Sequence, residues 1–488
     1  MMEETTQGKE RRNKIKLLEE KGIAPFGAKF KRTSEIADCL KDLTKLKNVN
    51  LAGRIIAKRL HGKANFMDIK DSSGKIQLYI REDSLDEMSF WLFSQVLDIG
   101  DFIGVKGEPF KTRTGEPTIK VESITLLTKT LNPLPEKWHG LKDVETRFRQ
   151  RYLDLLSNDK VKDIFLKRSK IIAKTREFFD SRGFLDVETP MMQPVAGGAT
   201  GRPFKTHHNA LDLDLYLRIA PELYLKRLIV AGLDKVYEIN RNFRNEGIST
   251  RHSPEFTMLE VYTAYADYED MIVLCEELIS HLVEEISGTT YISYQGKKID
   301  LKRPWKRLSF AKLMKENYDI NPDDPLKQWI EKLKKKGKDL PQLEGAAVNK
   351  LSRSQILNLI TDIFEPASID KPVFLTDWFA ETCPLAKRQA DNPLLVERFE
   401  LFIGGLEIAN AYSELNDPIE QERRFQEELK QDEKGSTRRL DEDYITALSY
   451  GMPPCGGLGI GMDRLIMLLS DSASIREVIL FPLLKPLE

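Results

Sequence analysis

VYEINRNFRNE at residues 236–246 and PEFTMLEVYTA at residues 254–264 are the stretches that indicate the fold, because together they have the pattern of a β-hairpin. Side chains on a strand alternate between its two faces. The polar side chains of the first stretch therefore share one face, while its apolar side chains share the other. We expect one floor of the hairpin to display five side chains: Arg244, Glu246, Phe256, Glu260 and Tyr262.

This floor carries groups that can bind a nucleotide and an amine. An arginine fork matches the geometry of a phosphate or a carboxylate. The aromatic ring of Phe256 can cover an adenine, and the glutamate carboxylates can hold an amine. A half-exposed hairpin with ordinary surface charges is the alternative that the pattern alone leaves open.

A second stretch, RFELFIGGLEIANAYSEL at residues 398–415, also alternates. Small residues, alanine and serine, alternate there with Asn410, Tyr412 and Glu414. This alternation indicates a close-packed sheet with a polar site on one face. Glu400 and Glu407 lie just upstream. Two carboxylates beside a phosphate site are natural Mg²⁺ ligands, because Mg²⁺ prefers hard oxygens and shares them with substrate phosphate. Ordinary surface carboxylates are the alternative.

A third stretch, GMPPCGGLGIGMDRLIMLL at residues 451–469, is a small-residue strand that runs into a helix. Its glycines do not have the G-x-G-x-x-G spacing, so a dinucleotide-binding fingerprint is excluded. Arg464 lies near the start of the helix, where anions are favoured. Tight packing between strand and helix explains the glycines equally well, but not the arginine.

The chain before these stretches is β-rich. We predict five strands, with one helical segment at about 84–98 between the third and the fourth, and this order is typical of an OB-type barrel. The strands lie at about 51–60, 64–70, 75–81, 101–109 and 117–127. Phe66 and Gln77 fall on the outer face of neighbouring strands, where an aromatic ring and an amide suit the reading of an unpaired base. A lone exposed phenylalanine is the alternative.

The whole chain therefore has an α+β pattern with several parts. Amphipathic helices at about 160–182 and 267–287 alternate irregularly with β-rich runs, unlike a regular βαβ fold. We expect four segments: a basic helical extension at 1–49, the OB-type barrel at 50–130, a linker at 131–150, and a large domain at 151–488 with a helical insertion at about 320–368.

Composition agrees with this division. The chain has 488 residues, enough for about three domains of ordinary size. Its net charge is −1, but residues 1–70 alone carry +8, which suggests a polyanionic partner or simply a solvated basic helix. No apolar run is long enough to span a membrane, and no secretory signal is present. The four cysteines are far apart, so we predict no zinc and a reducing cytoplasm.

Several of these stretches resemble class II lysyl-tRNA synthetases. Residues 180–192 (DSRGFLDVETPMM), 243–260 (FRNEGISTRHSPEFTMLE) and 457–469 (GLGIGMDRLIMLL) resemble the three motifs of class II, in the right order. The run RFRQRYLDLL at 147–156 is similar to the subgroup for lysine, aspartate and asparagine. Three further runs are similar to the lysine members: PVAGGATGRPF (194–204), RIAPELYLKR (218–227) and GGLEIANAYSELNDP (404–418).

The resemblance implies an antiparallel active-site sheet flanked by helices, and a homodimer. It also implies a reaction in two steps, in which L-lysine and ATP with Mg²⁺ give lysyl-adenylate and pyrophosphate, and the lysyl group then passes to the terminal ribose of lysine tRNA.

The resemblance further assigns roles to residues. ATP is expected to contact Arg244, Glu246, His252, Phe256 and Arg464, with the two arginines as the catalytic cations, and Mg²⁺ is expected at Glu400 and Glu407. The α-ammonium of lysine is assigned to Glu222 and the Gly198 region, its ε-ammonium to Glu414 and Tyr262, and supporting roles to Asn410 and Glu260. Phe66, Gln77 and Glu116 are expected to contact the anticodon.

Three other functions are compatible with parts of this pattern. One is a synthetase for aspartate or asparagine, but carboxylates at the end of the pocket favour a cationic side chain. Another is a relative that attaches lysine to a protein, but such relatives resemble the catalytic domain alone. The third is an inactive nucleic-acid-binding protein, against which the retained Arg244, Arg464, Glu400 and Glu407 argue.

Overall fold

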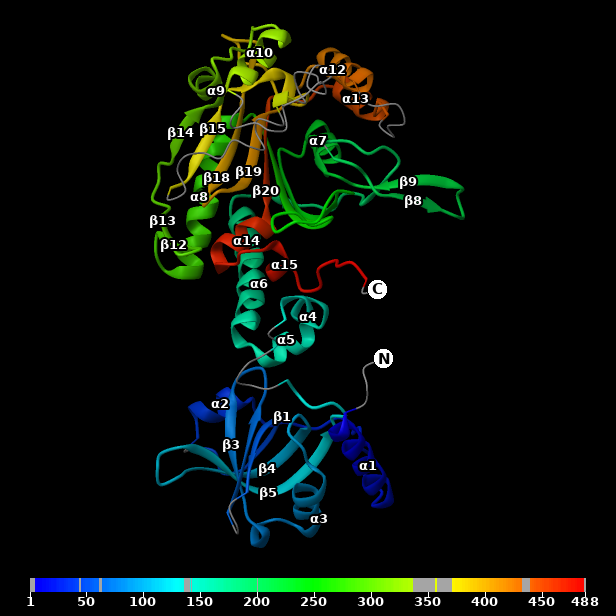
Figure 1. Ribbon diagram of the computed structural model, residues 1–488, viewed down its shortest axis with the longest axis vertical. Helices are drawn as coiled ribbons and strands as arrows, with labels where there is room; N and C mark the ends of the chain where they lie inside the picture. Colours follow the sequence, from blue (N-terminus) through cyan, green and yellow to red (C-terminus); the bar gives the residue numbers. More distant parts are fainter. Residues whose placement is uncertain are drawn as a thin grey trace. The chain divides into compact units, whose positions relative to one another are not determined.

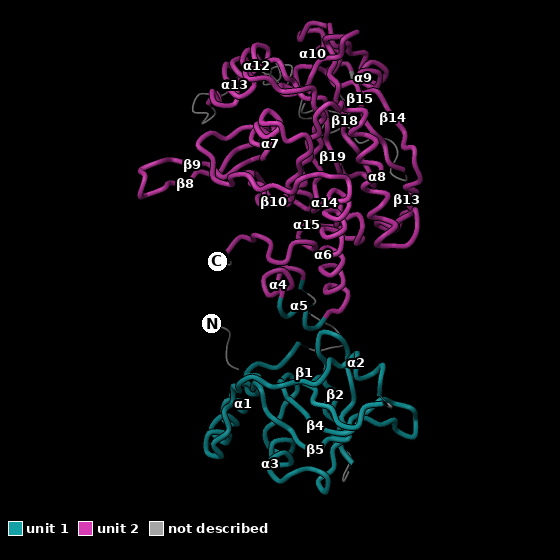
Figure 2. The backbone as a smooth tube through the Cα atoms, turned by 180° about the vertical axis from the view of Figure 1, so that it is seen from behind, with its two compact units in different colours: residues 1–143, 152–157 teal, residues 144–151, 158–488 magenta. Residues whose placement is uncertain are grey.

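The computed structural model describes residues 5–43, 45–60, 64–135, 141, 143–199, 201–336, 356–357, 371–431 and 439–486 (Figure 1). Within it the chain divides into two compact units. The first comprises residues 1–143 and 152–157, and the second comprises residues 144–151 and 158–488 (Figure 2).

The first unit is built on a closed five-stranded barrel in the order β1-β2-β3-β5-β4, which confirms the predicted OB-type fold. Its strands are β1 (Val49–Arg59), β2 (Asn65–Lys70), β3 (Lys75–Ile80), β4 (Phe102–Lys111) and β5 (Pro117–Thr128). Helix α3 (Glu87–Trp91) continues into a π-helical turn (Leu92–Val96) between β3 and β4, after a short 3₁₀ turn (Glu82–Ser84). Alternate side chains such as Met67, Ile69 and Leu78 are fully buried in the barrel.

The basic N-terminal segment packs on this barrel. It contains α1 (Thr6–Glu20) and α2 (Ile36–Lys41). Arg11 is buried and donates to the carbonyl of Ile99 at 3.0 Å, while Lys14 pairs with Asp98 at 2.6 Å. Two of the charges that suggested a polyanionic partner therefore hold the helix in place, whereas Lys9 and Lys16 remain exposed.

The predicted linker at 131–150 needs a correction, because helix α4 (Val144–Arg149) occupies its C-terminal end. Phe148 is buried there and lies 5.1 Å from the Arg151 guanidinium and 5.3 Å from that of Arg476. A single apolar anchor in a run of charges gives too little periodicity to indicate a helix.

The second unit is built on an eight-stranded sheet in the order β14-β15-β18-β19-β20-β11-β10-β6. All neighbouring pairs are antiparallel except β6–β10 and β14–β15. The strands are β6 (Leu185–Asp186), β10 (Lys235–Phe243), β11 (Glu255–Ala264), β14 (Lys306–Ser309), β15 (Val373–Thr376), β18 (Arg398–Ile403), β19 (Leu406–Ser413) and β20 (Cys455–Gly461). This confirms the expected antiparallel-rich sheet flanked by helices.

One face of the sheet is covered by α6 (Asp159–Asp180), α8 (Tyr268–Ser287) and α14 (Met462–Ser470) (Figure 1). Leu259, Ala411 and Leu458 from three adjacent strands are buried against these helices. Side chains alternate on strands, so the neighbours of these residues project from the opposite face. That opposite face is where the pocket lies.

The structure describes further, smaller elements. They are helices α5 (Arg151–Ser157), α7 (Glu222–Val230), α9 (Phe310–Tyr318), α10 (Leu326–Lys336), α12 (Pro418–Gln431), α13 (Glu442–Ser449) and α15 (Ile475–Val478), a 3₁₀ turn (Ala380–Thr382), and strands β7 (Met192–Gln193), β8 (Lys205–His208), β9 (Leu213–Leu217), β12 (Tyr291–Tyr294), β13 (Lys297–Asp300), β16 (Trp378–Phe379) and β17 (Leu395–Val396). Of the predicted insertion at 320–368, most lies outside the described residues. Among the helices that the structure describes, none is long and apolar enough to cross a membrane.

Candidate active site

The floor of the pocket is the glycine strand β20, between β11 and β19. Gly459 pairs with Glu260 on one side and with Asn410 on the other. Gly457 pairs with Tyr262 and Tyr412 in the same way. Residues paired across a sheet project from the same face, so two rows of polar side chains flank a bare strip of backbone. The alternation predicted for β11 and β19 is therefore confirmed, and it explains the glycines of the third stretch.

Gly457 is required for a second reason. A Cβ atom at this position would lie 1.9 Å from Glu414 Oε1 and 2.8 Å from the Tyr262 ring. The space that a side chain would fill is therefore occupied by a functional carboxylate. The resulting cavity has a volume of about 410 Å³ and extends from Glu414 to Arg464.

One end of the cavity contains three buried carboxylates. Glu222, Glu260 and Glu414 are at most 6% exposed, and no hydrogen bond to the Glu414 oxygens is found among the described residues. Burial, reinforced by Glu222, raises the pKa of Glu260 to about 8. Burial also raises the pKa of Glu414 well above its ordinary value, although a nearby lysine opposes this. Three buried carboxylates in one place carry more negative charge than their surroundings neutralise, which makes this end a site for ammonium groups.

Gly198 closes this end beside Glu222. Its φ of +86° is in the left-handed region, which favours glycine. A Cβ atom there would also lie 3.1 Å from the Glu222 Cβ. The sequence-predicted pair of Gly198 and Glu222 is thus brought together, at the start of α7 where the helix dipole favours a carboxylate.

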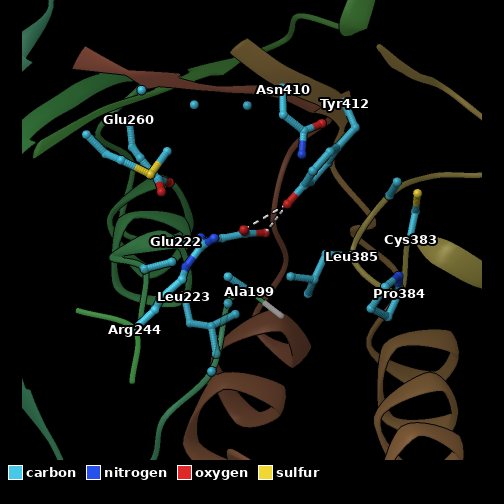
Figure 3. Close-up of a pocket in the computed structure, with 18 of the residues that line it drawn as sticks. Ala199, Glu222, Leu223, Arg244, Glu260, Cys383, Pro384, Leu385, Asn410 and Tyr412 are labelled. Carbon is cyan, nitrogen blue, oxygen red and sulfur yellow. Dashed lines mark hydrogen bonds between the residues drawn. The ribbon is translucent and has the colours of Figure 1, made fainter. Parts of the chain in front are cut away.

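Two tyrosines orient these carboxylates. The Tyr262 hydroxyl donates to Glu260 Oε2 at 3.0 Å. The Tyr412 hydroxyl lies 2.7 Å from both oxygens of Glu222 and donates to that carboxylate, and Figure 3 shows the two side chains pointing toward each other. The role of Tyr412 was not predicted, because only the fold brings β19 against α7.

Lys226 is a residue of this site that the sequence reasoning missed. Its side chain is fully buried, its Nζ lies 2.5 Å from Glu222 Oε1, and it also forms an ion pair with Glu414 Oε2. The four-residue spacing from Glu222 on a helix was the one signal that could have suggested it.

The other end of the cavity is cationic. Arg244, just after β10, is largely buried, and its Nε has no hydrogen-bond partner among the described residues. Burial lowers its pKa, and its guanidinium lies 5.2 Å from the centre of the Phe256 ring. A buried arginine with an unused donor is prepared for an anion.

Arg464 and His252 continue this cationic end toward solvent. Arg464 Nη1 donates to the Glu407 backbone and carboxylate, both at 3.0 Å, and Arg464 Nη2 donates to His252 Nε2 at 3.1 Å. His252 is therefore neutral, with its Nδ1 proton directed to Ser249 Oγ at 2.9 Å. Desolvation and Arg464 lower the pKa of His252, which agrees with this tautomer. Glu246 is exposed at the rim of the same end.

Glu400 and Glu407 have the properties of a Mg²⁺ site. Each carboxylate hydrogen-bonds an arginine through one oxygen, Glu400 to Arg398 at 2.6 Å and Glu407 to Arg464, which leaves the other oxygen for a cation. Burial raises the pKa of Glu400 to about 7, against the effect of Arg398, and Glu407 adds to the rise. A divalent cation relieves such repulsion and prefers oxygen ligands, so these residues fit Mg²⁺.

Arg398 links the two ends of the cavity and was also missed. Its Nε donates to Asn410 Oδ1 at 3.0 Å, and its Nη1 lies 2.8 Å from the Cys383 sulfur. All four cysteines, Cys39, Cys275, Cys383 and Cys455, are buried and free. Among the described residues, no group of three or more histidine, cysteine or acidic side chains could hold a metal.

Asp463, beside Arg464, holds together the elements that carry the cationic end of the site. It is buried, and its carboxylate accepts from the Thr257 backbone at 2.7 Å and from Arg168 at 2.6 Å. Arg168 in turn donates to the Thr257 hydroxyl at 3.0 Å. These bonds tie α6, β11 and α14 together, which explains the aspartate at the start of α14.

The barrel of the first unit has its own candidate surface. Phe66 and Gln77 are both partly exposed on adjacent strands, as predicted. Thr118 donates to Gln77 Oε1 at 3.0 Å and lies 3.1 Å from the Glu116 carbonyl, so these positions are close together. The Phe66 ring lies 5.3 Å from that of Tyr79, which extends the surface available for stacking.

Comparison with known proteins gives the family. Residues 143–485 match the model of the class II tRNA synthetases (D, K and N), and residues 49–127 match that of the OB-fold nucleic acid binding domain. The chain is 55% identical to the lysine–tRNA ligase of Carboxydothermus hydrogenoformans, over 98% of both chains. It is 54% identical to that of Pelotomaculum thermopropionicum, over 98% of this chain and 94% of the relative. The chain therefore belongs to the class II tRNA synthetases and, among them, to the lysine–tRNA ligase family.

Proposed function

We propose that this chain joins L-lysine to lysine tRNA in two steps, with ATP as the energy source. The observation that carries the proposal is one cavity with three buried carboxylates at one end and, at the other, an arginine whose buried Nε has no hydrogen-bond partner among the described residues. The first end suits the ammonium groups of lysine, and the second suits the carboxylate and the phosphates that must react.

In the first step, the lysine carboxylate attacks the α-phosphorus of ATP, and pyrophosphate leaves with the electrons of the broken bond. Arg244 is positioned to hold both reacting anions, with Phe256 under the adenine and Arg464, Glu246 and His252 toward the phosphates. The carboxylate is already a nucleophile, so orientation and charge stabilisation supply most of the rate. Bound Mg²⁺, held by Glu400 and Glu407, would neutralise phosphate charge.

Lysine lies across the glycine strand in this proposal. Its α-ammonium meets Glu222 beside Gly198, and its ε-ammonium meets Glu414 and Tyr262, with Glu260 and Asn410 in support. A neutral side chain would leave these buried carboxylates unpaired, and that penalty discriminates strongly without an editing step.

In the second step, the 3′-hydroxyl of the terminal ribose attacks the lysyl carbonyl, and AMP leaves. Phe66, Gln77 and Glu116 on the barrel would bind the anticodon by stacking and hydrogen bonding. We expect the enzyme to act as a homodimer in the cytoplasm, a placement that its four free cysteines favour.

The test is amino-acid-dependent exchange of pyrophosphate into ATP without tRNA, measured for lysine, ornithine, arginine, aspartate and asparagine. We expect exchange with lysine far above the others. Exchange with aspartate or asparagine would contradict the assigned role of Glu414. Folded protein that shows no exchange with any amino acid, with Mg²⁺ present, would favour a binding protein instead.

A further inference from the structure

Lys226 does not line the cavity itself, but it contacts two carboxylates that do, and no role has been assigned to it. It lies one helical turn after Glu222 on α7, and its side chain is fully buried. Its Nζ contacts one carboxylate from its own helix and a second, Glu414, from the end of β19. These two carboxylates are the ones expected to receive the two ammonium groups of lysine.

The groups that face Lys226 come from every element packed around it. They are Glu222 on α7, Tyr412 and Glu414 at β19, Cys455 on β20 and Tyr444 on α13. Glu260 and Tyr262 on β11 interact in turn with Glu222. Three of these groups are carboxylates, and the others are neutral hydroxyls or a thiol at ordinary pH. Among these surroundings Lys226 supplies the positive charge.

The charges of the pocket balance with lysine bound. When all three carboxylates are ionised, the resident ammonium leaves a net charge of −2, whereas in the empty pocket near neutral pH Glu260 is protonated, because burial raises its pKa to about 8. L-lysine brings two ammonium groups to this end, while its carboxylate goes to Arg244 at the other end. A buried site without net charge avoids the large cost of an uncompensated charge.

We propose that Lys226 is a fixed counter-ion that keeps Glu222 and Glu414 in place as acceptors and sets the pocket for two ammonium groups. This inference rests on the proposed function and makes Lys226 a positioning residue for lysine. Nothing in the two-step reaction requires Lys226 to touch ATP.

The ionisation of the pair agrees with this role. Burial opposes the ammonium form of Lys226, but Glu222 and Glu414 outweigh burial and hold its pKa well above the ordinary value. Lys226 likewise opposes the upward shift that burial gives the pKa of Glu414. Without Lys226, the pKa of Glu414 would rise further, and lysine would have to displace a more firmly held proton in order to bind.

A purely structural ion pair is the competing explanation, and it predicts a different result. If the ion pair served folding alone, removal of one buried partner would lower the stability of the whole protein and affect lysine and ATP alike, so a loss confined to lysine binding would not follow. The chain offers a matched control on the same helix. Arg227 pairs with Asp441 and Asp443 at 2.8 and 3.0 Å, and among the described residues it forms no ion pair with Glu222, Glu260 or Glu414.

The experiment compares Lys226→Met with Arg227→Met in lysine-dependent pyrophosphate exchange. For Lys226→Met we expect the lysine KM near neutral pH to rise about tenfold or more, with the ATP KM of the folded protein little changed. The rise should shrink as the pH is raised to about 9, because the carboxylates then ionise without help. Arg227→Met should leave the lysine KM and its pH profile unchanged. Lys226→Gln carries the same expectation as Lys226→Met and replaces it if that variant does not fold.

Chemical rescue tests the charge directly. Lys226→Ala opens room for n-butylamine, which should lower the lysine KM of this variant, whereas n-butanol of similar size should not. In the unchanged protein the amine should only inhibit. Wild-type exchange with an unaltered lysine KM in the Lys226 variants, or rescue by both compounds alike, would overturn the inference alone. No lysine-dependent exchange by the wild type would overturn the proposed function and this inference together.

Discussion

The two ends of the cavity differ in charge and in how far their side chains are exposed to solvent. At the amino-acid end, Glu222, Glu260 and Glu414 are almost fully buried. At the nucleotide end, Glu246 and His252 are exposed, and the Arg464 side chain is 23% exposed. Buried charges interact strongly because water does not screen them, whereas exposed charges interact weakly. Discrimination among similar amino acids needs the first environment, while a large and highly charged nucleotide can be held in the second.

Arg244 is the exception that joins the two ends. Arg244 carries a positive charge like the other side chains of the nucleotide end, but its guanidinium is largely buried like the carboxylates of the amino-acid end. Its Nε has no hydrogen-bond partner among the described residues. The interactions that stabilise a transition state are worth most where water is excluded. The comparison therefore identifies Arg244 as the residue whose loss should damage catalysis most.

Arg244→Gln should have the largest effect. We expect lysine-dependent exchange to fall by about 100-fold or more, since a single stabilising donor contributes on the order of 3 kcal/mol. The matched control is Arg241→Gln, which removes a surface arginine on the same strand that lies 3.6 Å from Glu255. A loss of similar size in both variants would show that the strand, and not the Arg244 guanidinium, is what matters.

The pH dependence of lysine binding tests the buried end. Burial and Glu222 raise the pKa of Glu260 to about 8, so the empty pocket holds a proton that an ammonium ligand must displace. Below about pH 8, lysine affinity should therefore rise with pH, by up to tenfold for each unit, and then level off. The measurement is the lysine KM between about pH 6 and about pH 8.5. Glu260→Gln should flatten the slope, and an equally steep slope in that variant would assign the proton elsewhere.

How much of this site was predictable depends on the range of the contacts. Alternation along single strands was sufficient to place Glu260 and Tyr262 on the same face of β11, and Asn410 and Tyr412 on the same face of β19. The register of the sheet then places both pairs on one face of the whole sheet. The barrel strands and Phe66 were predicted for the same reason. Such features depend on the period of one strand, which the sequence displays directly.

Contacts between distant elements were not predictable in this way. Lys226, the Tyr412 hydroxyl and Arg398 acquire their roles only when α7, β18 and β19 converge on one cavity. Phe148 in α4 was missed because one buried ring in a charged run has no period. The glycines of β20 were noticed as packing residues, yet Gly457 is required because its Cβ would meet the Glu414 carboxylate, which comes from a distant part of the sequence.

Gly457→Ala should have a smaller but specific effect on the buried end. The added methyl group would lie on Glu414 Oε1, so the carboxylate must move. We expect the lysine KM to rise about tenfold, in line with the cost of overpacking a filled site. Gly461→Ala is the control on the same strand, because the nearest atoms to its Cβ are 3.8 Å away. If the two variants bind lysine equally well, the position of Glu414 is not what limits binding.

Phe66→Ala should have the smallest effect, and it should leave both ends of the cavity untouched. Phe66 lies in the other compact unit, so exchange without tRNA should not change. Charging of lysine tRNA should show a KM for tRNA about fivefold higher, since stacking of a base on one ring contributes at least 1 kcal/mol. Phe102→Ala is the control, because Phe102 is a partly exposed ring on β4 that is covered by Arg54 at 4.1 Å. A fall in exchange with Phe66→Ala would mean that the barrel influences adenylate formation, and the separation between recognition of tRNA and activation of lysine would then fail.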